Sequence, residues 1–164
     1  MIMLLALQDF PRQDPAEFLY TLSAACLEHT ERLGDTDMAC LNDEQHTLTA
    51  YCYLDSQVQE GGFVQLIAEG YGEYIFNNPL ADSLRRWRIK PTPKILDQAK
   101  SLYQKHGSDI EKLSENGTPL DEIRKQFPEF EELDGDYYET ADTDLATAAE
   151  YVAANWAKFA ELAE

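Results

Sequence analysis

The sequence predicts an all-α fold, a single compact domain made of several helices. Apolar residues recur at helical spacing along most of the 164 residues, and several segments open with residues that cap helices. No run of alternating apolar and polar residues marks a convincing strand. With 44% hydrophobic and 11% aromatic residues, the chain has enough apolar material for a core, which excludes a wholly disordered acidic tail.

Capping residues and glycines delimit the first helices. A helix is predicted over 14–34, because an aspartate N-cap and a proline at the first helical position open it and a glycine closes it. A second is predicted over 42–62, from an asparagine–glutamine capping box to a glycine pair. A short third helix follows, with an apolar face formed by Phe63, Leu66 and Ile67.

Prolines mark the helices of the second half of the chain. Asparagine or threonine followed by proline opens a helix over 79–87, a longer one over 93–103 and a short one over 119–127, which the next proline stops. The last helix is predicted to begin at about Asp142 and to continue to residue 160, with one apolar side.

The N-terminal segment and the cysteines favour a location in the cytoplasm. Residues 1–7 are apolar but lack a basic segment and a cleavage pattern, so we expect them to dock on the core, with a signal peptide as the weaker alternative. No stretch approaches the roughly 20 apolar residues that span a bilayer. Cys26, Cys40 and Cys52 are an odd, irregularly spaced set, which favours reduced thiols in a cytoplasmic protein.

Sequence motifs for cofactors and catalysis are missing, so we expect no cofactor, no metal and no enzymatic activity. The aspartates between 134 and 144 fail the calcium-loop spacing, because the glycine falls second rather than sixth. The cysteines and histidines lack the close pairs typical of zinc sites. No nucleophile elbow or phosphate loop is present. A small acidic adaptor or enzyme that uses the Gly61–Phe63 region as part of a pocket remains the alternative.

The negative charge is concentrated at the two ends of the domain. The chain has a formal net charge of −18. Residues 1–60 hold 11 acidic and 2 basic residues, residues 129–164 hold 11 and 1, and the middle, 61–128, holds 9 and 10, which makes it nearly neutral. Such a surface repels phosphates, which excludes direct binding of nucleic acid or an anionic membrane and permits a basic partner.

A basic cluster lies in this neutral middle and surrounds Trp87. We interpret it as neutralising nearby acids or facing a second subunit, and we expect a homodimer through this region, where self-repulsion is least and where Trp87 and Tyr103 offer apolar area. The cluster consists of Arg85, Arg86, Arg88, Lys90 and Lys94.

The densest acidic run, 129–144, is the leading candidate for a partner-binding surface. No lysine or arginine occurs between Lys125 and Lys158, and aromatic and leucine side chains between the acids are expected to hold the run on a folded surface. The candidate surface comprises Asp35, Asp37, Asp43, Glu44, Glu129, Glu131, Glu132, Asp134, Asp136, Glu139, Asp142, Asp144 and Glu150.

The stretch Glu60-Gly61-Gly62-Phe63-Val64-Gln65 resembles the Asn-Gly-Gly-Phe-x-Gln signature of a bacterial family of small helical proteins, with Glu60 where many members have asparagine. The resemblance covers roughly residues 40–110, and the family includes an acidic DNA mimic. It implies a dimeric helical protein whose carboxylates imitate the phosphates of duplex DNA and competitively block a DNA-binding face. The partners it implies are a helix-turn-helix transcriptional repressor and a histone-like nucleoid protein.

Overall fold

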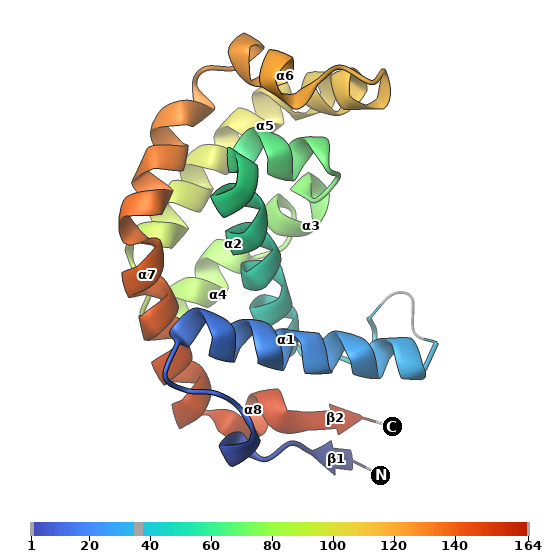
Figure 1. Cartoon of the computed structure of the whole chain (residues 1–164), viewed down its shortest axis with the longest axis vertical. Helices are drawn as coiled ribbons and strands as arrows, with labels where there is room; N and C mark the ends of the chain where they lie inside the picture. Colours follow the sequence, from blue (N-terminus) through green and yellow to red (C-terminus); the bar gives the residue numbers. More distant parts are fainter. Residues whose placement is uncertain (1, 35–37, 164) are drawn as a thin grey trace.

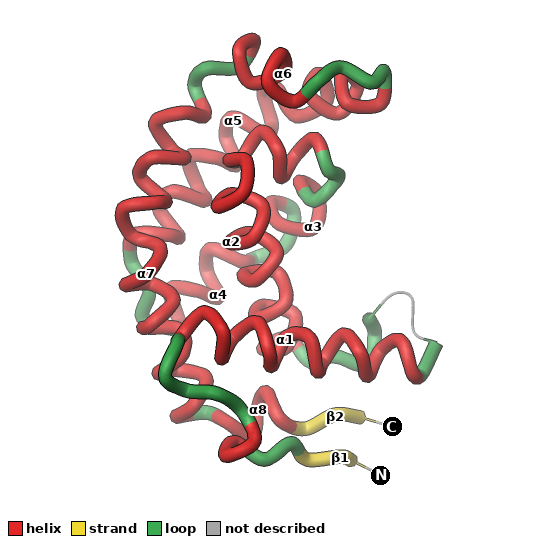
Figure 2. The backbone as a smooth tube through the Cα atoms, viewed as in Figure 1, coloured by secondary structure: helices red, strands yellow, loops and turns green. Residues whose placement is uncertain are grey.

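The computed structural model describes residues 2–34 and 38–163 and confirms the all-α fold. Helices make up most of it (Figure 2). The elements in chain order are β1 (Ile2–Leu4), the short 3₁₀ turn η1 (Leu7–Asp9), α1 (Pro15–Arg32), α2 (Asp43–Ala68), α3 (Gly72–Phe76), α4 (Leu80–Arg86), α5 (Pro91–Glu115), α6 (Leu120–Gln126), α7 (Phe130–Ala154), α8 (Trp156–Ala160) and β2 (Glu161–Ala163).

Helix α2 runs through the middle of the molecule, and α1, α5 and α7 pack against it. Helix α7 follows one long side of the domain, next to α5 (Figure 1). The core between these helices is rich in aromatic side chains, among them Tyr51, Phe63 and Trp87, each at most 1% exposed. Burial of this apolar area is the main favourable term in folding.

The residues predicted to cap the first two helices form the expected hydrogen bonds. The Asp14 carboxylate accepts hydrogen bonds from the amides of Ala16 and Glu17, at 3.0 and 3.3 Å, and so caps α1. At the start of α2, both halves of the Asn42–Gln45 capping box are formed.

The predicted boundary at the glycine pair is present as a kink between two helical segments of α2. Helical structure continues from Asp43 to Ala68, interrupted at Gly62, whose φ of 80° and ψ of −179° are not helical. A positive φ of this size favours glycine, because a side chain would clash with the backbone.

The last helix starts earlier than predicted, at Phe130 rather than about Asp142. Its N-cap, Glu129, makes no side-chain capping bond, so no capping signal marks the start. Packing takes the place of a cap, since Phe130, Leu133 and Tyr137 are all buried. The helix also ends earlier, because Asn155 is non-helical and separates α7 from α8.

A small strand pair was not expected. Strand β1 pairs antiparallel with β2, which places the two ends of the described chain side by side (Figure 1). Three residues per strand are too few for a visible alternation. Residues 5–7 pack on the core as predicted for the N-terminal segment, through Leu5 and Leu7, whereas Leu4 is 64% exposed.

A buried carboxylate links three helices. Asp55 of α2 is 4% exposed and accepts hydrogen bonds of 2.5 Å from the hydroxyls of Tyr20 in α1 and Tyr137 in α7. Burial, together with the nearby Asp55 charge, raises the pKa of both tyrosines, which therefore remain donors at neutral pH. This contact fixes α7 against α1 and α2.

Candidate partner-binding surface

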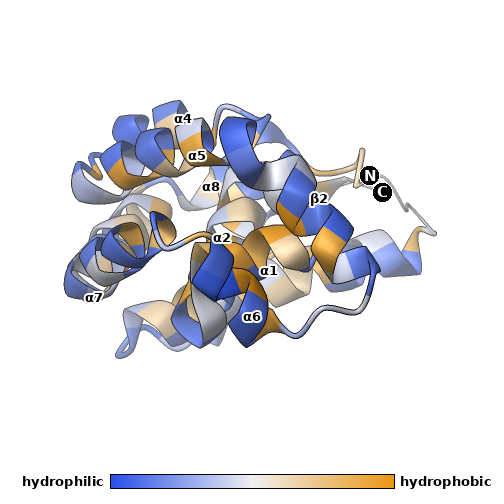
Figure 3. Cartoon of the chain, turned by 90° about the horizontal axis from the view of Figure 1, so that it is seen from above, coloured by the Kyte–Doolittle hydropathy of each residue, from blue (hydrophilic) through white to orange (hydrophobic). Residues whose placement is uncertain are grey.

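Exposed carboxylates line one side of α7. We call this set the α7 acidic face, and it consists of Glu131, Glu132, Asp136, Glu139, Asp142 and Glu150, all exposed. At about 100° per residue, these six positions fall within an arc of about 140° around the helix axis. The buried residues of α7 lie on the opposite side. Figure 3 shows hydrophilic residues along α7.

No ion pair within the described residues neutralises this face. The ion pairs there join Arg85 to Asp82 and Asp97, Arg86 to Glu44, His106 to Glu129, and Arg124 to Asp121. The α7 helix itself contains no lysine or arginine. The face is therefore a patch of unpaired negative charge on a rigid helix.

The spacing of this charge is comparable to that of a DNA strand. From Glu131 to Glu150 the helix rises about 29 Å, at 1.5 Å per residue. Six carboxylates over that length give about two-thirds of the charge density of one strand of duplex DNA, which carries one phosphate per 3.4 Å. The length approaches the roughly 34 Å of one DNA turn.

Asp144, predicted on this surface, lies instead in the interior. Its side chain is 3% exposed and accepts hydrogen bonds from the Thr92 amide at 3.0 Å and the Thr92 hydroxyl at 2.5 Å. Thr92 lies in the first turn of α5, whose N-cap provides no side-chain cap. Asp144 therefore caps α5 from a neighbouring helix and does not face a partner.

Asp134, also predicted on this surface, is half-buried at its edge. One carboxylate oxygen accepts a hydrogen bond of 2.8 Å from the Phe63 amide, just after the kink of α2. Burial raises the pKa of Asp134 to about 6, with nearby Glu131 acting in the same direction. The Phe63 amide and the Arg124 guanidinium oppose the rise.

We expect Asp134 to lower stability as the pH rises from about 4 to about 6, because the folded state binds its proton more tightly than the unfolded chain does. Asp134→Asn removes this titration and keeps a hydrogen-bond acceptor. Relative to that of wild type, the free energy of unfolding of the variant should increase by about 1 kcal/mol between pH 4 and pH 7. Solvent screening makes this smaller than the roughly 3 kcal/mol expected for a fully buried carboxyl. Urea unfolding at several pH values measures the gain, and a difference that does not change with pH would contradict it.

Other predicted residues are neutralised or lie elsewhere. Glu44 has a side chain 12% exposed and is paired with Arg86, and it also accepts a hydrogen bond from the Tyr151 hydroxyl at 2.7 Å. Glu129 is exposed and contacts Nε2 of His106 at 2.7 Å, a hydrogen bond that becomes an ion pair only when the imidazole is protonated. A backbone hydrogen bond and this contact together lower the pKa of Glu129. Asp35 and Asp37 lie outside the described residues.

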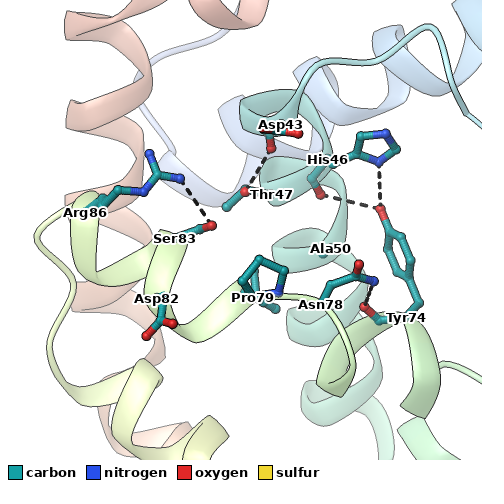
Figure 4. A pocket seen from close by; sticks show the side chains of 11 residues that line it. Asp43, His46, Thr47, Ala50, Tyr74, Asn78, Pro79, Asp82, Ser83 and Arg86 are labelled. Carbon is teal, nitrogen blue, oxygen red and sulfur yellow. Dashed lines mark hydrogen bonds between the residues drawn. The ribbon is translucent and has the colours of Figure 1, made fainter.

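Asp43 lies on a separate pocket of about 590 Å³ between the start of α2 and helices α3 and α4 (Figure 4). In this pocket His46 and Tyr74 face one another, and Arg86 donates to the hydroxyl of Ser83 at 3.2 Å. Asp43 is exposed but does not belong to the α7 acidic face.

Several expectations about individual residues were wrong. Trp87 is 0% exposed and stacks on Tyr151, so it offers no area to a second subunit. Tyr138 is 46% exposed and donates its hydroxyl hydrogen to the carbonyl of Val58 at 2.8 Å, rather than docking on the core. The homodimer itself stays a prediction.

The basic cluster is partly explained by ion pairs. Arg85 and Arg86 neutralise nearby acids, as one of the two interpretations held. Cys26 and Cys52 are buried, each within a hydrophobic cluster. Within the part of the chain that the structure describes, no group of three or more histidine, cysteine, aspartate or glutamate residues is arranged to hold a metal ion.

The sequence reasoning missed a hollow beside the kink of α2. It has a volume of about 660 Å³ and brings Glu60 of α2 next to Glu131 and Glu132 of α7, with Arg124 of α6 between these elements. Glu60 stands where many members of the family have asparagine in the glycine signature. The spacing of the neighbouring residues in the sequence does not indicate that Glu60 lies next to α7.

Comparison with known proteins identifies the family. In the described residues, no helix is both long and apolar enough to cross a membrane. Residues 39–155 match the model of the family described as DMP19-like protein. The chain is 60% identical over 157 residues to the DNA mimic protein DMP19 of Neisseria meningitidis serogroup B, an alignment that covers 96% of this chain and 95% of that protein. The chain belongs to the DMP19-like protein family.

Proposed function

We propose that this protein is a DNA mimic that competitively occupies the DNA-binding face of a basic protein. The observation that supports this most is the α7 acidic face, an exposed and unpaired row of carboxylates on one side of a long helix. The relative that is 60% identical is named a DNA mimic protein, which supports the same function. Mimicry requires no catalysis, and we propose none.

The partner that fits this face has basic side chains spaced to meet DNA phosphates. Helix-turn-helix repressors and histone-like nucleoid proteins have such surfaces, and the family resemblance implies both classes. Exposed charges steer association and weaken as salt rises, so the complex should be sensitive to ionic strength. The dependence should be less steep than for DNA, because a folded protein lacks the condensed counterions of the polymer.

Displacement of DNA tests the proposal. A histone-like nucleoid protein is bound to a fluorescein-labelled duplex of 30 base pairs, and the chain is added while fluorescence anisotropy is followed. We expect the anisotropy to fall to the value of free duplex, and the affinity of the chain for the nucleoid protein to drop on the order of tenfold between 50 and 200 mM salt.

Two controls define the outcome. The chain added to the labelled duplex alone should leave its anisotropy unchanged, because like charges repel. The same titration with a helix-turn-helix repressor on its operator shows which class of partner is bound. If the chain displaces DNA from neither class at micromolar concentration, it is not a DNA mimic of this kind, and the adaptor alternative gains support.

A further inference from the structure

The kink of α2 is held by side chains from two other helices. On one side, Arg124 of α6 donates from Nε and Nη2 to the carbonyl oxygen of Gly61, at 3.1 and 2.8 Å. On the other side, Asp134 of α7 accepts the amide hydrogen of Phe63, at 2.8 Å. The two side chains therefore form hydrogen bonds to the two peptide groups that flank Gly62, and we call this pair of contacts the grip on the kink.

The charges of this pair match the backbone groups that the kink exposes. A carbonyl at the end of a helical segment attracts a cation, and an amide at the beginning of the next segment attracts an anion. A guanidinium on Gly61 and a carboxylate on Phe63 satisfy both groups with charge-assisted hydrogen bonds, which are stronger than neutral ones. Both backbone groups that the kink removes from the helical ladder therefore have side-chain partners.

The glycine pair leaves room for this grip. A Cβ atom at Gly62 would clash with the carboxylate of Asp134, and one at Gly61 would lie 2.7 Å from Nη2 of Arg124 and would also clash with the Gln65 side chain. Gly62 additionally has the positive φ that other residues rarely adopt. The glycines of the signature therefore admit the two gripping side chains as well as the bend.

The elements joined in this way bear the carboxylates around the hollow. Glu60 lies just before the kink, while Glu131 and Glu132 lie in the first turn of α7, close to Asp134. A surface that imitates a fixed phosphate array gains affinity when its charges are already in place before binding, because less conformational freedom is lost. The grip on the kink supplies that preorganisation.

We propose that Asp134 and Arg124 are positioning residues of the α7 acidic face, which fix the start of α7 on the kink of α2 and do not themselves contact the partner. This inference rests on the proposed function. Its distinctive requirement is a hydrogen-bond acceptor at position 134, whereas a contact residue of the face would require the charge.

The experiment compares Asp134→Ala, Asp134→Asn and Glu139→Gln. The last removes one exposed charge of the face and leaves the kink untouched. The first readout is hydrogen exchange of the Phe63 amide by NMR, and the second is the concentration that displaces half of the labelled duplex from the nucleoid protein. We expect Asp134→Ala to speed exchange at Phe63 at least tenfold and to raise the displacing concentration at least fivefold above that of Glu139→Gln. Asp134→Asn keeps a neutral acceptor, so it should match Glu139→Gln in displacement and should lie closer to wild type than to Asp134→Ala in exchange.

The outcomes separate this inference from the proposed function. If wild type displaces DNA and Asp134→Ala is no worse than Glu139→Gln, or if Asp134→Asn is as poor as Asp134→Ala, Asp134 is not a positioning residue. If wild type displaces no DNA, the mimic function fails, while exchange at Phe63 still decides whether Asp134 holds the kink. Should Asp134→Ala fail to fold, Arg124→Ala breaks the other half of the grip, and the same comparison with Glu139→Gln applies.

Discussion

Replacing Asp144 by alanine should lower the free energy of unfolding by about 3 kcal/mol, because two buried donors would lose their acceptor. Both the amide and the hydroxyl of Thr92 donate to this carboxylate, and Thr92 is 0% exposed, so neither donor reaches bulk solvent in the folded protein. The change also removes the only side-chain cap that the structure gives to the first turn of α5 within the described residues.

The control for this prediction is Asp142→Ala, two residues away on the exposed side of the same helix. Both variants remove one carboxylate from α7, so they change helix propensity and net charge alike. Asp142→Ala should shift stability by less than about 0.5 kcal/mol, as surface substitutions usually do. Equal urea midpoints for the two variants would show that Asp144 does not cap α5.

The helices with chemical start signals could be predicted from the sequence. An aspartate, an asparagine or a proline in the right place marked the beginnings of α1, α2, α4 and α6. Helix α7 has no such signal, because Glu129 caps nothing and the start depends on burying Phe130 and Leu133. Contacts between distant segments decide that start, and local propensity does not show them.

The error at the start of α7 explains the misplacement of Asp134, whereas Asp144 lay inside the predicted helix and was misplaced because its buried partner, Thr92, is 52 residues away in sequence. Without a predicted helix before Asp142, residues 129–141 had no helical phase, and every acid in that segment looked equally exposed. With the helix begun at Phe130, the spacing of about 100° per residue places Asp134 and Asp144 on the side of the buried leucines, away from the α7 acidic face. Helical periodicity could have placed both aspartates on the buried side of α7. It could not have identified their hydrogen-bond partners, since Phe63 is 71 residues from Asp134 in sequence.

Reversing four charges on the α7 acidic face should abolish DNA displacement. The variant changes Asp136, Glu139, Asp142 and Glu150 to lysine, which leaves the start of α7 and the hollow intact. Each exposed charge contributes up to about 1 kcal/mol, and reversal replaces attraction by repulsion, so the displacing concentration should rise on the order of 100- to 1000-fold. Fluorescence anisotropy in 150 mM salt measures it, and circular dichroism checks that the helices remain.

A matched variant separates the position of the charges from their sum. Glu69, Glu73, Asp109 and Glu115 are exposed acids outside α7, and changing these four to lysine alters the net charge from −18 to −10, as does the α7 variant. If the protein presents a phosphate-like row, the displacing concentration of the matched variant should rise less than about tenfold, because long-range attraction is screened within about 8 Å at this salt. If both variants fail alike, the partner responds only to net charge. If the α7 variant still displaces DNA at the wild-type concentration, the mimic surface lies elsewhere on the molecule.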